Sequence, residues 1–131
     1  MAAMLQVKIF ANKKTLDGYR DRISTAIHQS VTQVLGATVH SNHRFFSLEP
    51  YDFTSPEERS ENYLILELTM LEGNPPEVKK QLLKSIFTRL EQEAAFSPRD
   101  VEIIINETPG HNWGILGRTA DESAVIHKMG V

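Results

Sequence analysis

Residues 102–118 read EIIINETPGHNWGILGR. The apolar run Ile103–Ile105 predicts a strand, because branched aliphatic residues favour strands. A polar segment follows it, with a Pro-Gly pair and Trp113, the single tryptophan of the chain. Neighbouring residues of a strand point to opposite faces of its sheet, so three apolar residues in a row need cover on both faces. The rest of the chain must therefore supply that cover.

The composition of the 131 residues is that of an ordinary globular protein, with 40% hydrophobic and 24% charged residues. This length predicts one domain, residues 1–131. The net charge of −3 argues against a nucleic-acid partner, because such a partner requires a basic surface. The absence of cysteine excludes disulfides and thiolate zinc sites.

The N-terminal residues MAAMLQVKIFANKK carry Lys8 inside their apolar run, which is not the pattern of a secretory signal. No apolar stretch has the length that a membrane-spanning helix needs. We therefore expect a cytoplasmic protein with no membrane partner.

Two segments alternate apolar and polar residues with the period of a strand, and each is followed by apolar residues with the period of a helix. The second block repeats the first at an offset of 59 residues: Leu5, Val7 and Ile9 match Leu64, Leu66 and Leu68, and Tyr19, Ile23, Ile27 and Val31 match Val78, Leu82, Ile86 and Leu90. The same offset matches Ile103–Ile105 to Arg44–Phe46. We interpret the chain as two β-α-β units, residues 5–48 and 62–106, with a chance register of two amphipathic blocks as the alternative.

Residues that favour helix ends stand where the two predicted helices begin and end. The expected ends are Thr15 or Asp17 and then Gly36 for the first helix, and Asn74 as N-cap with Pro75 as first residue for the second. The polar segment 49–61 is expected to be a loop that joins the two units. Residues 107–131 are expected to form a terminal loop and tail.

Two right-handed β-α-β units build an α/β fold, a four-stranded sheet with both helices on one face. The other face is predicted to be apolar as well, because Tyr63 and Ile65 alternate with Leu64 and Leu66, and Ile104 lies between two isoleucines. The chain is too short to hold further helices for this face. An apolar face of this size is unusual on a monomer. We therefore predict a closed homo-oligomer whose sheets face one another.

Three stretches of the sequence resemble the tautomerase superfamily: AIHQSVTQVLG (26–36), LILELTMLEGNPPEVKKQLLKSIFTRLEQE (64–93) and DVEIIINETPGHNWGILG (100–117). The likeness covers about residues 5–118. It is closest to the longer members similar to malonate semialdehyde decarboxylase and cis-3-chloroacrylic acid dehalogenase, relatives of 4-oxalocrotonate tautomerase.

The resemblance implies a homotrimer with the fold of macrophage migration inhibitory factor and a pocket near each N-terminus, built in part by a neighbouring subunit. It implies no cofactor. An N-terminal proline acts as the base in the family, since a secondary amine in a partly desolvated pocket can accept a proton near neutral pH. Arginines hold the carboxylate of a small 2-oxo or enol acid.

The sequence departs from this pattern at its start. The family's proline aligns with Leu5, four residues precede it, and the first proline of the chain is Pro50. If Met1 is removed, the primary amine of Ala2 lies roughly 10 Å from the family's position. A second departure is Asn74, which stands where members of this type commonly have arginine. A role as helix N-cap also explains Asn74.

Two adjacent residues are candidates for catalysis. Arg44 matches an arginine of the longer members and can hold a carboxylate; alternatively it pairs with the acidic loop at Asp52, Glu57 and Glu58. His43 lies next to the position of an acidic, water-activating residue, and an imidazole can act as a base near neutral pH. The alternative is a histidine on a surface loop.

Three more residues are expected beside the substrate: Leu5 at the proline position, Asn74 in the turn, and Trp113. The indole of Trp113 can wall the pocket of a neighbouring subunit or fasten the oligomer, and both roles remain open. No metal site is expected, because the five histidines occur without thiolates or a His-Glu-x-x-His helix.

Two functions remain as hypotheses. The first is an enzyme that acts on a small 2-oxo or enol carboxylic acid by keto–enol tautomerisation, or by a related hydration or decarboxylation, with weak or altered activity because the proline is missing. The second is a non-catalytic trimer that keeps the pocket for binding a small anion or contacting a partner.

Overall fold

The computed structural model describes residues 4–122. Its main elements in chain order are β1 (Met4–Asn12), α1 (Lys13–Leu16), α2 (Arg20–Leu35), β2 (His40–Leu48), β3 (Leu64–Leu71), α3 (Pro76–Ala94) and β4 (Val101–Thr108). Three 3-10 turns, η1 (Pro50–Asp52), η2 (Pro98–Asp100) and η3 (Gly110–Asn112), and a small hairpin of β5 (Gly114–Ile115) and β6 (Arg118–Thr119) complete the fold.

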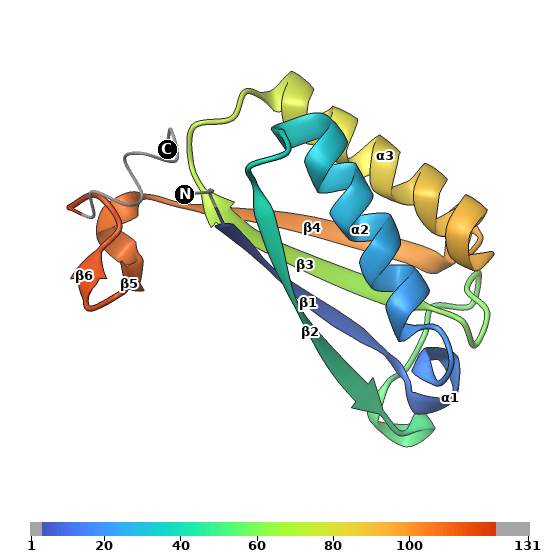
Figure 1. Ribbon diagram of the computed structural model, residues 1–131. Coiled ribbons are helices and arrows are strands. Elements are labelled where there is room, and N and C mark those ends of the chain that lie inside the picture. Colours follow the sequence, from blue (N-terminus) through green and yellow to red (C-terminus); the bar gives the residue numbers. More distant parts are fainter. Residues whose placement is uncertain (1–3, 123–131) are drawn as a thin grey trace.

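The four long strands form one sheet in the order β2-β1-β3-β4. β1 and β2 are parallel, β3 and β4 are parallel, and the two pairs meet through antiparallel β1 and β3. Helices α2 and α3 lie side by side across the same face of this sheet (Figure 1). This arrangement confirms the predicted α/β fold of two β-α-β units with both helices on one face.

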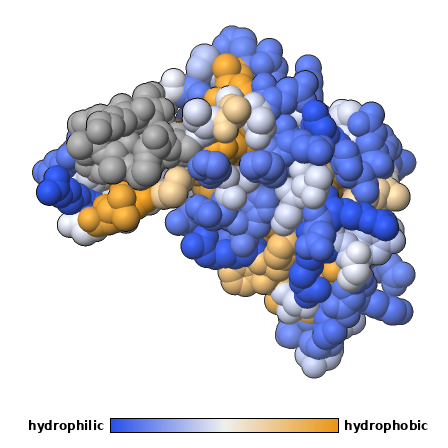
Figure 2. Space-filling view, in the orientation of Figure 1, coloured by the Kyte–Doolittle hydropathy of each residue, from blue (hydrophilic) through white to orange (hydrophobic). Residues whose placement is uncertain are grey.

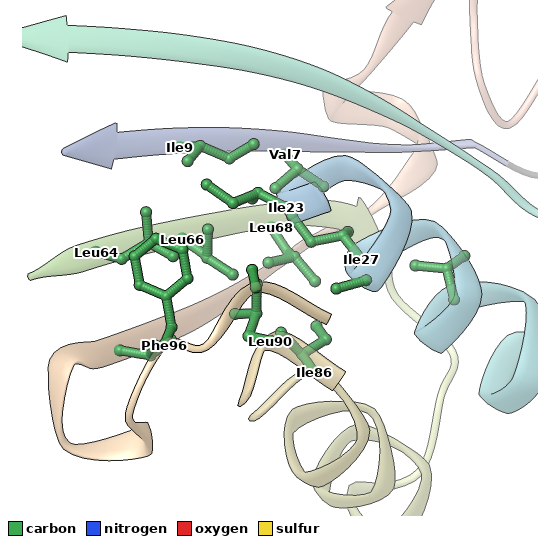
Figure 3. Packing of buried hydrophobic residues seen from close by; sticks show 14 of the residues in the cluster. Val7, Ile9, Ile23, Ile27, Leu64, Leu66, Leu68, Ile86, Leu90 and Phe96 are labelled. Atoms are coloured by element: carbon green, nitrogen blue, oxygen red, sulfur yellow. The ribbon is translucent and has the colours of Figure 1, made fainter. Parts of the chain in front are cut away.

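The core fills the layer between the sheet and the helices (Figure 3). The alternating apolar positions of both predicted strands are fully buried there, as are the apolar positions of both helices: Leu5, Val7, Ile9, Leu64, Leu66, Leu68, Ile23, Ile27, Val31, Leu82, Ile86 and Leu90. Burying such a side chain stabilises the fold by about 1.5–3 kcal/mol. Of the other two repeat positions, Tyr19 is exposed and Val78 is only partly buried.

The first helix begins differently from the prediction. The short helix α1 intervenes, and α2 starts after Tyr19 without a side-chain cap. Asp17 instead pairs with Lys13 and Arg20, while the Thr15 hydroxyl donates to the Glu61 carbonyl oxygen 3.0 Å away. Gly36 does end the helix: its φ is +114°, which favours glycine, and its N–H donates to the Thr32 carbonyl oxygen.

The second helix begins one residue later than predicted. Pro75 is the N-cap and Pro76 the first helical residue, so the assignment of Asn74 as N-cap is wrong. The physical reason is the Pro-Pro pair: a proline disfavours the helical conformation in the residue before it, and Pro75 is accordingly extended. The fixed φ of Pro76 suits the first helical position.

The sheet face opposite the helices is mixed rather than uniformly apolar. It carries stacked rings of Phe10 and Phe46, 4.7 Å apart, together with Ile65 and Ile104, and the last of these is 45% exposed. Lys8, the exposed Arg44, Glu67 and Glu102 share this face.

Part of this face is covered by the chain itself. Tyr63, expected to need another subunit, is only 4% exposed, because Phe53 from the linker stacks on it at 5.4 Å. The linker is held in place by Asp100, whose two oxygens accept from the backbone N–H and the hydroxyl of Ser60, each at 2.7 Å. The polar segment 49–61 is therefore more than a connection.

Candidate functional site

One end of the sheet is the region that the resemblance singles out. β1 runs antiparallel to β3, so the start of β1 lies beside the C-terminal ends of β3 and β4 (Figure 1). Gln6 pairs with Thr69, and Thr69 with Asn106. A short turn joins the end of β3 to the start of α3, so the first turn of this helix lies at the same edge of the sheet.

An ion pair lies at this edge. Lys79, in the first turn of α3, and Glu107, near the end of β4, meet with 2.6 Å between Nζ and Oε1. Their side chains are 28% and 22% exposed. The second oxygen of Glu107, Oε2, is buried and has no hydrogen-bond partner among residues 4–122. Neither residue was predicted from the sequence. A signal was present, because Glu107 lies on the same side of β4 as Ile103 and Ile105, which pack against the core, and a charged residue is unusual there.

Asn74 lies in the turn between β3 and α3, half-buried and just after Gly73, whose φ is +132°. Since it does not cap the helix, capping no longer accounts for this residue. Its place is at the same end of the sheet as Lys79 and Glu107. A contact with substrate remains a prediction.

Leu5 is 1% exposed and belongs to the core beneath the helices. Its side chain is therefore not available to a ligand in this subunit. The strand begins one residue before the predicted start, at Met4, and the alternation of the strand turns Leu5 toward the helices.

His43 and Arg44 point to opposite faces of β2, because they are consecutive residues of a strand. His43 lies under α2: its Nδ1 is 2.8 Å from the Ser24 hydroxyl and its Nε2 is 2.7 Å from the Ser41 hydroxyl. Burial, with a smaller contribution from His28, lowers the pKa of His43. His43 therefore does not lie on a surface loop, and its side chain is on the opposite face of the sheet from that of Arg44.

Arg44 is exposed on the helix-free face, in register with Lys8. Within residues 4–122 no ion pair joins it to Asp52, Glu57 or Glu58, the partners considered from the sequence. A single subunit therefore does not bring His43 and Arg44 into one pocket. A role for Arg44 requires a ligand, or another subunit, on the open face of the sheet.

Trp113 directly follows η3, in the segment that projects beyond the end of β4 (Figure 1). Its carbonyl oxygen accepts from the Ala120 N–H at 2.7 Å, which closes the β5–β6 hairpin. At the hairpin turn Leu116 is 69% exposed with φ of +55°. A hydrophobic patch is visible at the hairpin (Figure 2). The indole is half-buried, and its place at a neighbouring subunit's pocket remains a prediction.

A cavity at the other end of the sheet holds none of the predicted site residues. Its volume is about 580 Å³, and its lining is Asn12, Lys13, Lys14, Thr15, Asp17, Glu49, Pro50, Glu61 and Asn62. Within residues 4–122 no three His, Asp or Glu side chains gather as metal ligands would. No helix in that part of the chain combines the length and apolarity needed to cross a membrane.

The family model described as "Tautomerase enzyme" matches residues 40–116. The chain belongs to this family. The match begins at β2, runs through β3, α3 and β4, and ends in the hairpin turn after Trp113. It therefore includes Arg44, Lys79 and Glu107.

Solved structures share the fold over nearly the whole chain. A malonate semialdehyde decarboxylase, described with decarboxylase and hydratase activities, is 17% identical, with a TM-score of 0.78 over 96% of this chain and 98% of that one. A fused 4-OT described as an asymmetric trimer is 11% identical, with a TM-score of 0.75 over 96% and 99%. A member of the cis-3-chloroacrylic acid dehalogenase family is 13% identical, with a TM-score of 0.64 over 95% and 98%. Identities this low show the fold alone.

The burial of His43 predicts a pH-dependent stability. The unfolded side chain takes up its proton near pH 6.5 and the folded one only at lower pH. The unfolded state thus binds more protons below pH 6.5, so stability falls as the pH drops from there toward the folded pKa. His43→Gln, which keeps hydrogen-bonding groups for both serines, should lose less stability on acidification than the unmodified protein.

Urea unfolding of both proteins at about pH 7.5 and about pH 5 measures this difference. His111→Gln, at an exposed position in η3, is the matched control and should behave as the unmodified protein. Equal losses in all three proteins would contradict the assignment of a depressed pKa to His43.

Proposed function

We propose that this protein acts on a small 2-oxo or enol carboxylic acid, by keto–enol tautomerisation or a related hydration or decarboxylation. Membership of a tautomerase family supports this reaction class. The observation that carries it is the edge where β1 begins: the half-buried Asn74, Lys79 and Glu107 gather there, where the family is expected to have its pocket. Keto–enol tautomerisation moves a proton only, whereas the related reactions add water or release CO₂, and this proposal assigns no cofactor to any of them.

The substrate carboxylate needs a cationic partner. Lys79 is in the ion pair with Glu107, so the exposed guanidinium of Arg44 is the better candidate, and it can bind a carboxylate with two parallel hydrogen bonds. Because Arg44 projects from the helix-free face, it serves a pocket formed where a second subunit covers that face. Trp113, on the projecting segment, walls such a pocket in this proposal.

A homotrimer follows from the same face. The exposed part of Ile104 and the Phe10–Phe46 stack lie on it, and the fused 4-OT structures with this fold are described as trimers. Burial of these side chains between subunits stabilises the assembly by about 25 cal/mol for each Å² of apolar surface.

The second candidate is a non-catalytic trimer that binds a small anion. The specific observation in its favour is the sequence before Pro50, which contains no proline to act as the family's base. Both candidates have the same fold and the same proposed pocket. They differ in whether the bound acid is converted to a product.

Light scattering at micromolar concentration tests the assembly. The expected mass is three times the subunit mass of 14.8 kDa. Ile104→Asp places a charge in the covered face and should shift the mass toward one subunit, because burying an unpaired charge is costly. Lys80→Asp, at an exposed position of α3, is the control and should remain trimeric. A mass near 14.8 kDa for the unmodified protein would refute the trimer.

Ketonisation of phenylenolpyruvate separates the two candidate functions. A rate above that of buffer is expected, and Arg44→Gln should raise KM, since it removes the carboxylate partner. A rate equal to buffer for the unmodified protein would exclude the tautomerase proposal and favour the binding protein.

Leu5, which the resemblance aligns with the family's proline, is buried in the core, so the preceding Met4 is the better position for an N-terminal proline. A chain that begins at position 4 with Met4→Pro tests what the missing proline costs. Proline is tolerated at the first residue of a strand, and a well-placed base contributes about 10²–10⁴-fold in rate. An increase toward this range is expected if the pocket survives. The same truncation with Leu5→Pro is the matched control: it removes a buried side chain and places proline inside a central strand, so it should lose stability.

A further inference from the structure

The ion pair of Lys79 and Glu107 is not explained by stability. Exposed ion pairs contribute little to folding, and a partly buried pair must also offset the desolvation of two charges. Here one carboxylate oxygen, Oε2, is in addition buried without a partner in the described part of the chain. An unsatisfied buried acceptor destabilises the fold, so its retention points to a use other than holding the fold.

The geometry of the pair is that of an oriented base. Lys79 holds Oε1 at 2.6 Å and so fixes the direction of the carboxylate, while the lone pairs of Oε2 accept no hydrogen bond. The Glu107 side chain is 22% exposed, but its Oε2 is buried, so a substrate reaches this oxygen only after the carboxylate rotates. Rotation about the last side-chain bond, which is a soft and nearly two-fold torsion, exchanges the two oxygens.

The pair also stands where a replacement for the family's base is needed. Glu107 is on β4, paired with Met70 of β3, and β1 starts beside β3. With about 4.8 Å between adjacent strands, the start of β1 is roughly 10 Å from Glu107. A substrate bound at this edge can therefore be reached from Glu107 as well as from the beginning of the chain.

We propose that Glu107, oriented by Lys79, is the proton-transferring base of this site and takes the place of the absent proline. This inference rests on the proposed function. Oε2 takes the proton from the carbon next to the carbonyl group of a 2-oxo acid. The electron pair of the broken C–H bond forms the C=C bond, and the carbonyl pair moves to oxygen, giving the enolate. The proton returns to oxygen to give the enol, or to carbon to restore the keto acid.

Glu107→Gln tests the role of the carboxylate, because glutamine keeps the shape and can still accept from Lys79. Phenylenolpyruvate is the probe, and exchange of the C3 protons of phenylpyruvate in D₂O is the second readout. Both rates should fall by about 10²–10⁴-fold at unchanged mass and urea midpoint. Glu77→Gln is the control. It removes a negative charge at an exposed position in the first turn of α3, close to Lys79 in sequence, and should leave both rates unchanged.

Lys79→Met tests the positioning role. It should lower kcat and leave KM for phenylenolpyruvate nearly unchanged, because the carboxylate remains but is no longer oriented. Loss of stability without any change in kcat would show that Lys79 is only structural, and would overturn its part in the proposal.

The outcomes separate this inference from the proposed function. An active unmodified protein whose Glu107→Gln variant retains its rates within about twofold overturns the role of Glu107 and leaves the proposed function standing. An unmodified protein without activity overturns both. If Glu107→Gln does not fold, Glu107→Asp decides: it withdraws the carboxylate by one methylene group and should cost about a hundredfold, because a shift of about 1 Å has that effect. An unchanged rate in Glu107→Asp overturns the proposal.

Discussion

Two helices can cover only one face of a four-stranded sheet, and this constraint organises the whole molecule. Because side chains alternate along a strand, every residue of the sheet belongs either to the closed core or to the open face. Leu66 and Leu68 are fully buried on the helix side, whereas Ile104 remains 45% exposed on the other. The linker covers Tyr63, whereas Ile104 stays exposed in the single subunit.

The same alternation divides the candidate chemistry. His43 is enclosed between two serine hydroxyls beneath α2, while Arg44 faces the open side of the sheet. Residues of the open face can share a pocket only where subunits meet. The edge at which β1 begins is different, because Lys79 and Glu107 come together there within one chain. In this account the proton-transferring group is local to a subunit, and the anion-binding group comes through assembly.

Periodicity predicted the fold well, since the 59-residue repeat indicated both β-α-β units and includes 12 of the 19 buried residues of the core. That His43 and Arg44 point to opposite faces could also have been predicted, because neighbouring residues of a strand alternate between faces. The repeat matched only Arg44–Phe46 to a strand, so His43 was placed outside it. Other features depend on tertiary contacts between distant segments. The cover of Tyr63 by Phe53 comes from a loop without periodicity, and the pairing of Lys79 with Glu107 joins positions 28 residues apart. Asn74 was misassigned because two consecutive prolines moved the helix start.

Thiol labelling of the open face tests the central claim most directly, because the chain contains no cysteine of its own. Ile104→Cys introduces one thiol on the face that other subunits should cover, and Lys80→Cys introduces one on the exposed side of α3. In the native protein at micromolar concentration, the thiol at position 104 should react far more slowly than that at position 80, and urea should abolish the difference. Equal rates in the native state would mean that the open face is bare, and would contradict an assembly built on it.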